Sequence, residues 1–144
     1  MDIPRLKIGD PVKNYCFACS KENPIGLKLN FTREGDIARA EFTPREFYQG
    51  WPGYTHGGIL FTLLDEAAGY AVRYLGLHCV TAKTEVRFTK MAPIGEPILL
   101  EGRVVKNNPR LIETEATLSS KDGTNIARSQ SIWYVVKEAG EKKA

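Results

Sequence analysis

A histidine, two glycines and two carboxylates lie within one short apolar stretch, His56-Gly57-Gly58 followed by Asp65-Glu66. A glycine pair at a helix start leaves backbone N–H groups bare to an approaching ligand. A carboxylate on a helix that faces a core is costly to bury unpaired. The pattern predicts acyl-transfer chemistry, in which the Gly57 N–H, helped by the helix dipole, holds a carbonyl oxygen. Asp65 would attack the carbonyl carbon or activate a water.

The spacing of these groups predicts a site shared between two chains. Gly57 and Asp65 are eight residues apart, which is about 12 Å along a helix. Groups that act on one carbon must lie about 3 Å from it, so one of the two has to come from a second copy. Glu66 points about 100° away from Asp65, and we expect it to be an interface or ion-pair residue.

The elements that position these residues follow from hydrophobic periodicity. A helix from Ile59 to about Leu75 is apolar almost all round, which predicts burial, and Gly76 is a plausible end signal. Alternating patterns and turn residues predict a hairpin and then four strands in a meander. The strands are residues 27–32, 37–42, 80–89, 97–106, 111–119 and 124–136. The order predicts an α+β fold, a curved antiparallel sheet wrapped around one long central helix, and its open edges favour dimerisation.

Length and composition indicate one domain over residues 1–144, with a loop-like segment over 1–26 and a charged, frayed tail over 137–144. A formal charge of +3 suits an anionic small molecule and gives no argument for nucleic acid. The N-terminus lacks the apolar region of a signal peptide, and no run reaches membrane-spanning length. The three cysteines do not form a disulfide framework. We therefore expect a cytoplasmic protein.

Two motifs resemble those of a known family. Residues 49–53, Gln-Gly-Trp-Pro-Gly, precede His56-Gly57-Gly58-Ile59-x-x-Thr62-Leu63-Leu64-Asp65-Glu66, with an acid nine positions after the histidine. Near the N-terminus stand Cys16-Phe17-Ala18-Cys19 and Asn23-Pro24-Ile25-Gly26-Leu27. From about Cys16 to Val136 the chain resembles the hotdog-fold acyl-CoA thioesterase superfamily, closest to its phenylacetyl-CoA-thioesterase-like (PaaI-like) branch.

The resemblance implies hydrolysis of an acyl- or aryl-acyl-CoA thioester, with no metal or redox cofactor, by a homodimer or a dimer of dimers. The family's catalytic acid falls on Asp65, its oxyanion N–H on Gly57, and His56 lies beside the thioester. An assisting hydroxyl falls on Thr81. An orienting amide is assigned to Gln49, although the usual spacing lands on Gly50. In the family the acid and the glycine loop come from different protomers.

Weaker signals point to substrate binding. Basic residues of the later strands, such as Arg87 and Lys90, and the bare glycine Gly58 are candidates for contact with CoA, alongside Arg103, Lys106 and Arg110. An acyl pocket could be lined by the aromatic residues Trp51, Phe61 and Tyr70. For all three, packing in the core is the default interpretation.

Alternative interpretations remain for the whole protein and for its cysteines. They include an acyl-CoA-binding protein without turnover and a related dehydratase. For Cys16-x-x-Cys19 the alternatives are a redox pair or half of a zinc site completed by His78 and Cys79.

Overall fold

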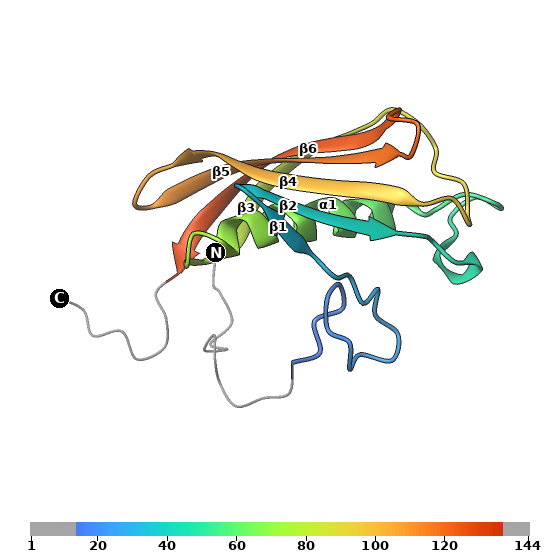
Figure 1. Cartoon of the computed structure of the whole chain (residues 1–144), viewed down its shortest axis with the longest axis horizontal. Coiled ribbons are helices and arrows are strands. Elements are labelled where there is room, and N and C mark those ends of the chain that lie inside the picture. The colour runs from blue at the N-terminus through green and yellow to red at the C-terminus, as the bar shows by residue number, and fades with distance from the viewer. Residues whose placement is uncertain (1–13, 137–144) are drawn as a thin grey trace.

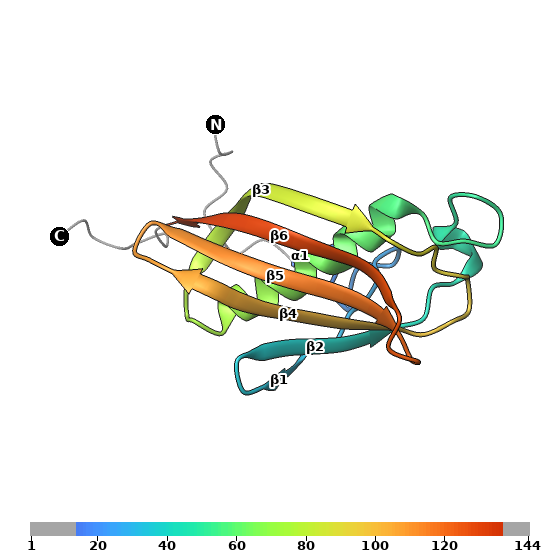
Figure 2. The same ribbon diagram turned by 90° about the horizontal axis from the view of Figure 1, so that it is seen from above.

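One long helix lies against a single curved sheet of six strands. The computed structural model describes residues 14–136, so residues 1–13 of the expected N-terminal loop and the expected tail 137–144 lie outside it. The elements are β1 (Thr32–Glu34), β2 (Ile37–Phe42), the 3-10 turn η1 (Glu46–Tyr48), α1 (Gly57–Arg73), β3 (His78–Phe88), β4 (Ile98–Asn107), β5 (Leu111–Ser120) and β6 (Asn125–Val136). Figures 1 and 2 show the sheet curving over α1, as the sequence predicted.

Buried and half-buried residues alternate along the strands, and the buried ones form the face of the sheet that covers α1. In β5, Ile112, Thr114, Ala116 and Leu118 are at most 1% exposed, while the residues between them are half-buried. Successive strand side chains point to opposite faces, so one set packs on the helix and the other faces away from it. The polar Thr114 is tolerated because its Oγ1 accepts a hydrogen bond from Trp133 Nε1 at 2.9 Å.

Small residues let α1 approach the sheet closely. A Cβ atom added to Gly102 of β4 would lie 2.1 Å from the backbone oxygen of Ala67. Gly69 likewise faces the ring of Trp133, whose Cη2 would lie 3.3 Å from an added Cβ. The helix backbone therefore packs directly on β4 at Gly102 and on the Trp133 ring of β6 at Gly69.

The helix begins two residues earlier than expected and buries one face rather than its whole circumference. Its buried residues are Leu60, Leu63, Leu64, Ala67, Ala68, Ala71 and Val72. Phe61 is 39% exposed, and Ile59, Tyr70 and Tyr74 are half-buried. A single sheet covers only one side of a helix. Part of the apolar surface of α1, which we expected to be buried all round, therefore stays exposed in a single chain.

The first predicted strand, residues 27–32, is wrong in its pairing although its alternation is right. Leu27 and Leu29 are buried, yet their N–H groups donate to Phe17 O at 2.8 Å and Ala18 O at 2.9 Å rather than to a strand. Lys28, with φ of 54°, breaks the extended path. Only Thr32–Glu34 pair, as β1 with β2. Residues 14–29 instead form a strap along the helix, and we use that name below.

The predicted meander is correct for β4, β5 and β6 and wrong for β3. The strand order is β1-β2-β4-β5-β6-β3, with antiparallel pairing. Strands β3 and β4 are thus three strand spacings apart, about 14 Å, and residues 89–97 bridge that gap. Three or four extended residues already reach roughly 10–14 Å, so the chain can carry β3 to the far edge.

No helix among residues 14–136 combines the length and apolar character that crossing a bilayer requires.

Candidate active site

Loop 43–56 delivers His56 to the start of α1. The His56 N–H donates to Tyr48 O at 2.8 Å, and the preceding Thr55 N–H donates to Ala92 O at 2.8 Å. Gly50 leaves room for the imidazole, because an added Cβ there would lie 3.3 Å from His56 Cδ2. The loop therefore fixes both the backbone and the ring of His56.

The imidazole of His56 caps the helix. Its Nδ1 accepts a hydrogen bond from the Gly58 N–H at 2.8 Å, as short polar side chains do at other helix starts. A neutral ring that accepts at Nδ1 carries its proton on Nε2, so Nε2–H points away from the cap as a donor. Gly58, predicted as a substrate contact, thus has its N–H already occupied.

The Gly57 N–H, by contrast, finds no acceptor among residues 14–136. Gly57 is exposed, and a Cβ added there would come no nearer to another group than 4.0 Å from Phe88 Cζ. This N–H lies in the first turn of α1, where the helix dipole favours negative charge. It can therefore receive an oxyanion, and the role predicted for Gly57 stays a prediction.

Asp65 lies in contact with Thr81, to which the resemblance assigns an assisting hydroxyl. Thr81 Oγ1 donates to Asp65 Oδ1 at 2.9 Å. Burial raises the pKa of the half-buried Asp65, and the hydrogen bond from Thr81 opposes part of that rise. A carboxylate whose pKa is raised is a stronger base than an exposed aspartate, which suits it to taking a proton.

A bulge in β3 sets the direction of Thr81. The pairing with β6 slips between Thr81, opposite Trp133, and Lys83, opposite Ile132. Bulges re-aim side chains and occur beside functional sites. Trp133 is buried against α1, so its partner Thr81 faces the helix as well. Sequence reasoning did not find this bulge.

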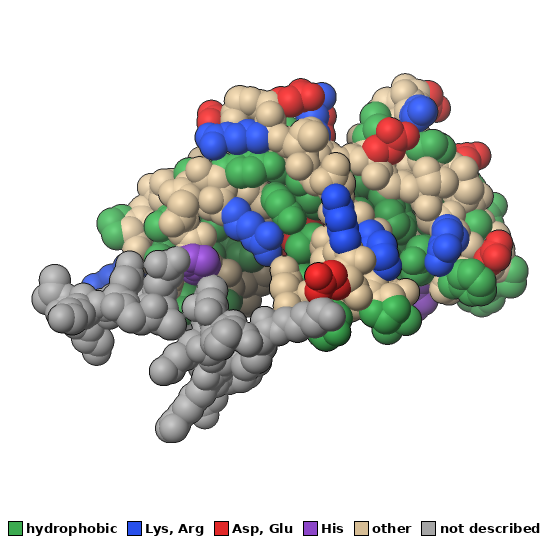
Figure 3. All heavy atoms as spheres, turned by 60° about the horizontal axis from the view of Figure 1, so that its bottom comes forward, with side chains coloured by type: hydrophobic (Ala, Val, Ile, Leu, Met, Phe, Trp, Pro, Cys, Tyr) green, Lys and Arg blue, Asp and Glu red, His purple; other side chains and the backbone are tan. Residues whose placement is uncertain are grey.

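Within one chain α1 holds the two halves of the predicted site apart. The helix runs without a break through Gly57 and Asp65, which places them about 12 Å apart along its axis. The start of α1 is surrounded by exposed apolar side chains from loop 43–56, α1 itself, the end of β3 and the segment after β3. They are Phe47, Trp51, Tyr54, Phe61, Phe88 and Met91. Figure 3 shows hydrophobic side chains gathered at this end of the molecule.

Other predicted site residues are placed elsewhere. The Gln49 amide serves its own loop, donating to Glu46 O at 2.7 Å and accepting from the Gly53 N–H at 2.5 Å. Arg87 pairs with Arg128 across the strands and, with Arg103, lines a hollow on the sheet face away from α1. Lys90 is exposed just beyond β3. The structure therefore does not bring Gln49 or Arg87 to Asp65.

Glu66 is an ion-pair residue, as predicted. One carboxylate oxygen lies 3.8 Å from Arg73 Nη2. Burial raises the pKa of Glu66, while the positive charge of Arg73 opposes the rise. Of the three aromatics proposed for an acyl pocket, Tyr70 stacks on Phe31 at a centroid distance of 4.4 Å, and Trp51 is 78% exposed.

Comparison with known proteins places this geometry in context. Residues 52–127 match the family model described as the thioesterase superfamily. Over 94 residues the chain is 31% identical to acyl-coenzyme A thioesterase THEM4 of Xenopus laevis, covering 65% of this chain and 42% of that protein. The chain therefore spans less than half the length of this relative.

Solved structures share the fold. The PaaI protein of the E. coli phenylacetic acid degradation operon aligns with a TM-score of 0.74 at 18% identity, over 78% of this chain and 83% of its own. A Streptococcus mutans protein bound to acetyl-CoA, smu.793, aligns with a TM-score of 0.72 at 20% identity, over 76% and 90%. The predicted hotdog fold is thereby confirmed.

Proposed function

The chain belongs to the thioesterase superfamily, and we propose that it hydrolyses an acyl- or aryl-acyl-CoA thioester to the free acid and CoA. The observation that carries the proposal is Asp65, half-buried on the helix and held by Thr81 at 2.9 Å. Binding of acetyl-CoA by the structural neighbour from S. mutans and the thioesterase name of the frog relative support the choice of substrate.

In the proposed reaction Asp65 takes a proton from a water, and the water oxygen attacks the thioester carbon. The carbonyl oxygen becomes an oxyanion, which the Gly57 N–H stabilises together with the helix dipole. The C–S bond then breaks, the acid leaves, and the CoA thiolate takes the proton from Asp65. The Nε2–H of His56 is a second donor for the carbonyl oxygen.

We propose that each site takes Asp65 from one chain and Gly57 from its partner in a homodimer or a dimer of dimers. The 12 Å separation along α1 and the exposed apolar side chains around the helix start support this arrangement. Exposed Lys90 remains our candidate for the CoA phosphates. The three cysteines are free thiols, in keeping with the cytoplasmic location we expect.

Thiol release from a panel of acyl-CoAs tests the role of Asp65. Asp65→Asn should lower kcat by about 100- to 10,000-fold, the usual contribution of a positioned base. Asp36→Asn makes the same chemical change in the exposed turn between β1 and β2 and should keep native activity. No thiol release from any acyl-CoA by native protein would favour a binding protein, and full activity of Asp65→Asn would remove Asp65 from the mechanism.

Gly57→Pro tests the oxyanion donor. Proline lacks the N–H, yet it is favoured at the first position of a helix, and the extended His56 before it (ψ 136°) suits a following proline. The variant should fold and lose roughly 100- to 1,000-fold in kcat.

Mixing Gly57→Pro and Asp65→Asn chains tests the shared site. In an equal mixture half of the dimers are mixed, and one of their two sites is intact, so about a quarter of native activity should return. No recovery after confirmed subunit exchange would place both groups in the same chain.

A further inference from the structure

The strap carries Cys16 and Cys19 on a tight turn that rests against α1. The Ser20 N–H donates to Cys16 O at 3.0 Å, which closes the turn. Between the two cysteines, Phe17 O and Ala18 O accept the backbone hydrogen bonds from Leu27 and Leu29 that dock the strap on itself. These backbone hydrogen bonds hold the main chain at both cysteines in place, while their side chains can still rotate.

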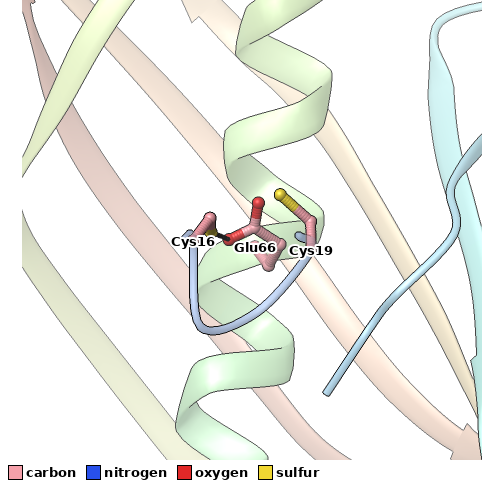
Figure 4. Close-up of side chains that lie close together, drawn as sticks. All are labelled: Cys16, Cys19 and Glu66. Carbon is pink, nitrogen blue, oxygen red and sulfur yellow. Dashed lines mark hydrogen bonds between the residues drawn. The ribbon is translucent and has the colours of Figure 1, made fainter. Parts of the chain in front are cut away.

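Glu66 projects from α1 into the space between the two cysteines (Figure 4). Its Oε2 lies 3.9 Å from Cys16 Sγ, and one ligand atom from each of Cys16, Cys19 and Glu66 lies within 4.8 Å of the others. All three side chains are half-buried. Two segments 47 residues apart in sequence therefore converge on one point with two thiols and a carboxylate.

We propose that Cys16, Cys19 and Glu66 bind a thiophilic divalent cation of the Zn²⁺ type. Thiolate and carboxylate are both ligands of zinc, with bond lengths of about 2.3 and 2.0–2.2 Å. Tetrahedral geometry with these lengths puts ligand atoms about 3.5–3.8 Å apart. Ligand atoms that now lie within 4.8 Å of one another need to approach by about 1.3 Å at most, which side-chain rotation supplies.

Charge supports the same assignment. Two thiolates, one carboxylate and a divalent cation sum to one negative charge, and Arg73 stands beside Glu66 at 3.8 Å to balance it. Within residues 14–136 no fourth cysteine, histidine or acid joins the group, so a water completes the coordination. In the proposed site Glu66 takes the place of His78 and Cys79, which the sequence suggested as the other zinc ligands. The proposal thereby departs from our expectation of no metal.

The cation would fasten the strap to α1 at the residue that follows Asp65. Metal binding of this kind contributes its free energy to the folded state, so it should hold the strap on the helix. The strap lies outside residues 52–127, the part of the chain that matches the family model. The site does not depend on the proposed hydrolase activity.

Cobalt is the probe for this site, because tetrahedral Co²⁺ bound to thiolate absorbs visibly and in the near ultraviolet. Reduced, chelator-stripped full-length protein is titrated with Co²⁺ and then with Zn²⁺. We expect one Co²⁺ per chain with a sulfur-to-cobalt band, displacement of that band by Zn²⁺, and a rise in Tm on Zn²⁺ addition. Absence of the band, or a CysXXCys disulfide seen by intact mass in protein kept under reducing conditions, would overturn the proposal.

Substitutions locate the ligands. Loss of an outer partner already lowers metal affinity by about 10- to 100-fold, so Cys16→Ser and Cys19→Ser should each lower Co²⁺ affinity by more. Glu66→Gln keeps both sulfurs, so it should retain the sulfur band at weaker affinity even where a cysteine variant folds poorly. Cys79→Ser is the matched control, because Cys79 packs against the core from β3 outside the cluster. Equal loss in Cys79→Ser would refute the assignment.

Discussion

Replacing Thr81 with valine removes the side-chain hydrogen bond that Asp65 accepts within residues 14–136. Valine keeps the branched shape and removes the donor to Asp65 Oδ1 at 2.9 Å. A hydrogen bond to a charged group contributes about 1.5–3 kcal/mol, and the half-buried position favours the lower end. We expect a loss of about 1.5 kcal/mol in the free energy of unfolding, or a fall in Tm of about 5 °C.

The same change should move the pH dependence of catalysis. The hydrogen bond from Thr81 lowers the pKa of Asp65, while burial raises it, so losing the bond lets the pKa rise further. The acidic limb of the thiol-release profile should therefore shift to higher pH. The loss of stability in Thr81→Val should be largest where Asp65 is ionised and should shrink on acidification. The reason is that the hydrogen bond from Thr81 stabilises the carboxylate more than the protonated carboxyl.

Thr84→Val provides the comparison for Thr81→Val. Thr84 lies on the same strand, and its hydroxyl bonds the neutral Ser131 hydroxyl at 3.0 Å. This variant should lose stability by about 1 kcal/mol without moving the pH profile. Thr81→Val could instead leave both the acidic limb of the pH profile and the stability unchanged. Thr81 would then not stabilise the Asp65 carboxylate, and our account of the site would fail.

Four further changes have defined outcomes. His56→Ala should lose the helix cap and about 1 kcal/mol of stability by chemical denaturation. Gly102→Ala should destabilise the fold by about 3 kcal/mol or more, because its methyl group would meet backbone at 2.1 Å. Ser129→Ala should leave stability unchanged or raise it by up to about 1 kcal/mol, because this buried hydroxyl has no partner among the described residues. Asp65→Asn should raise stability near neutral pH, since burial holds the pKa of Asp65 above its ordinary value, and this gain should vanish on acidification.

Matched variants separate these effects from general damage. His56→Asn restores a capping oxygen but not the Nε2–H, so recovered stability without recovered activity would support contact between His56 and substrate. Gly57→Ala enters open space and should stay within about 0.5 kcal/mol of native stability. Ser131→Ala breaks the bond to Thr84 and should cost about 1 kcal/mol. A stable Gly102→Ala or a more fragile Asp65→Asn would contradict the reasoning.

Local patterns in the sequence predicted most of the fold. Periodicity located α1 to within two residues at each end and the four long strands to within two residues. The motif from His56 to Asp65 predicted a bare N–H at Gly57 and an acid on the helix. The family resemblance assigned an assisting hydroxyl to Thr81, which donates to Asp65 in the structure. These features are local in the chain or carried by a motif, so the residues themselves determined them.

Long-range contacts decided the pairing of the N-terminal segment and the faces on which the β3 side chains lie. Alternation in residues 27–32 indicated a half-buried segment but not its partner, and the strap took the place of a strand. Simple alternation would put Thr81 and Arg87 on one face of β3. The bulge after Thr81 reverses that parity, so Thr81 faces Asp65 while Arg87 lies beside Arg128 on the other face. A bulge depends on how two strands fit together, and no single stretch of sequence encodes that.

The chemical pairing of Cys16, Cys19 and Glu66 is likewise a product of tertiary structure. The sequence showed two cysteines in a loop-like segment and a carboxylate next to Asp65, separated by the hairpin and loop 43–56. Only the docking of the strap on α1 brought the three side chains within 4.8 Å. Residue types fixed which chemistry the chain can perform, whereas folding chose which of those residues meet, because contacts between distant segments depend on packing of the whole core.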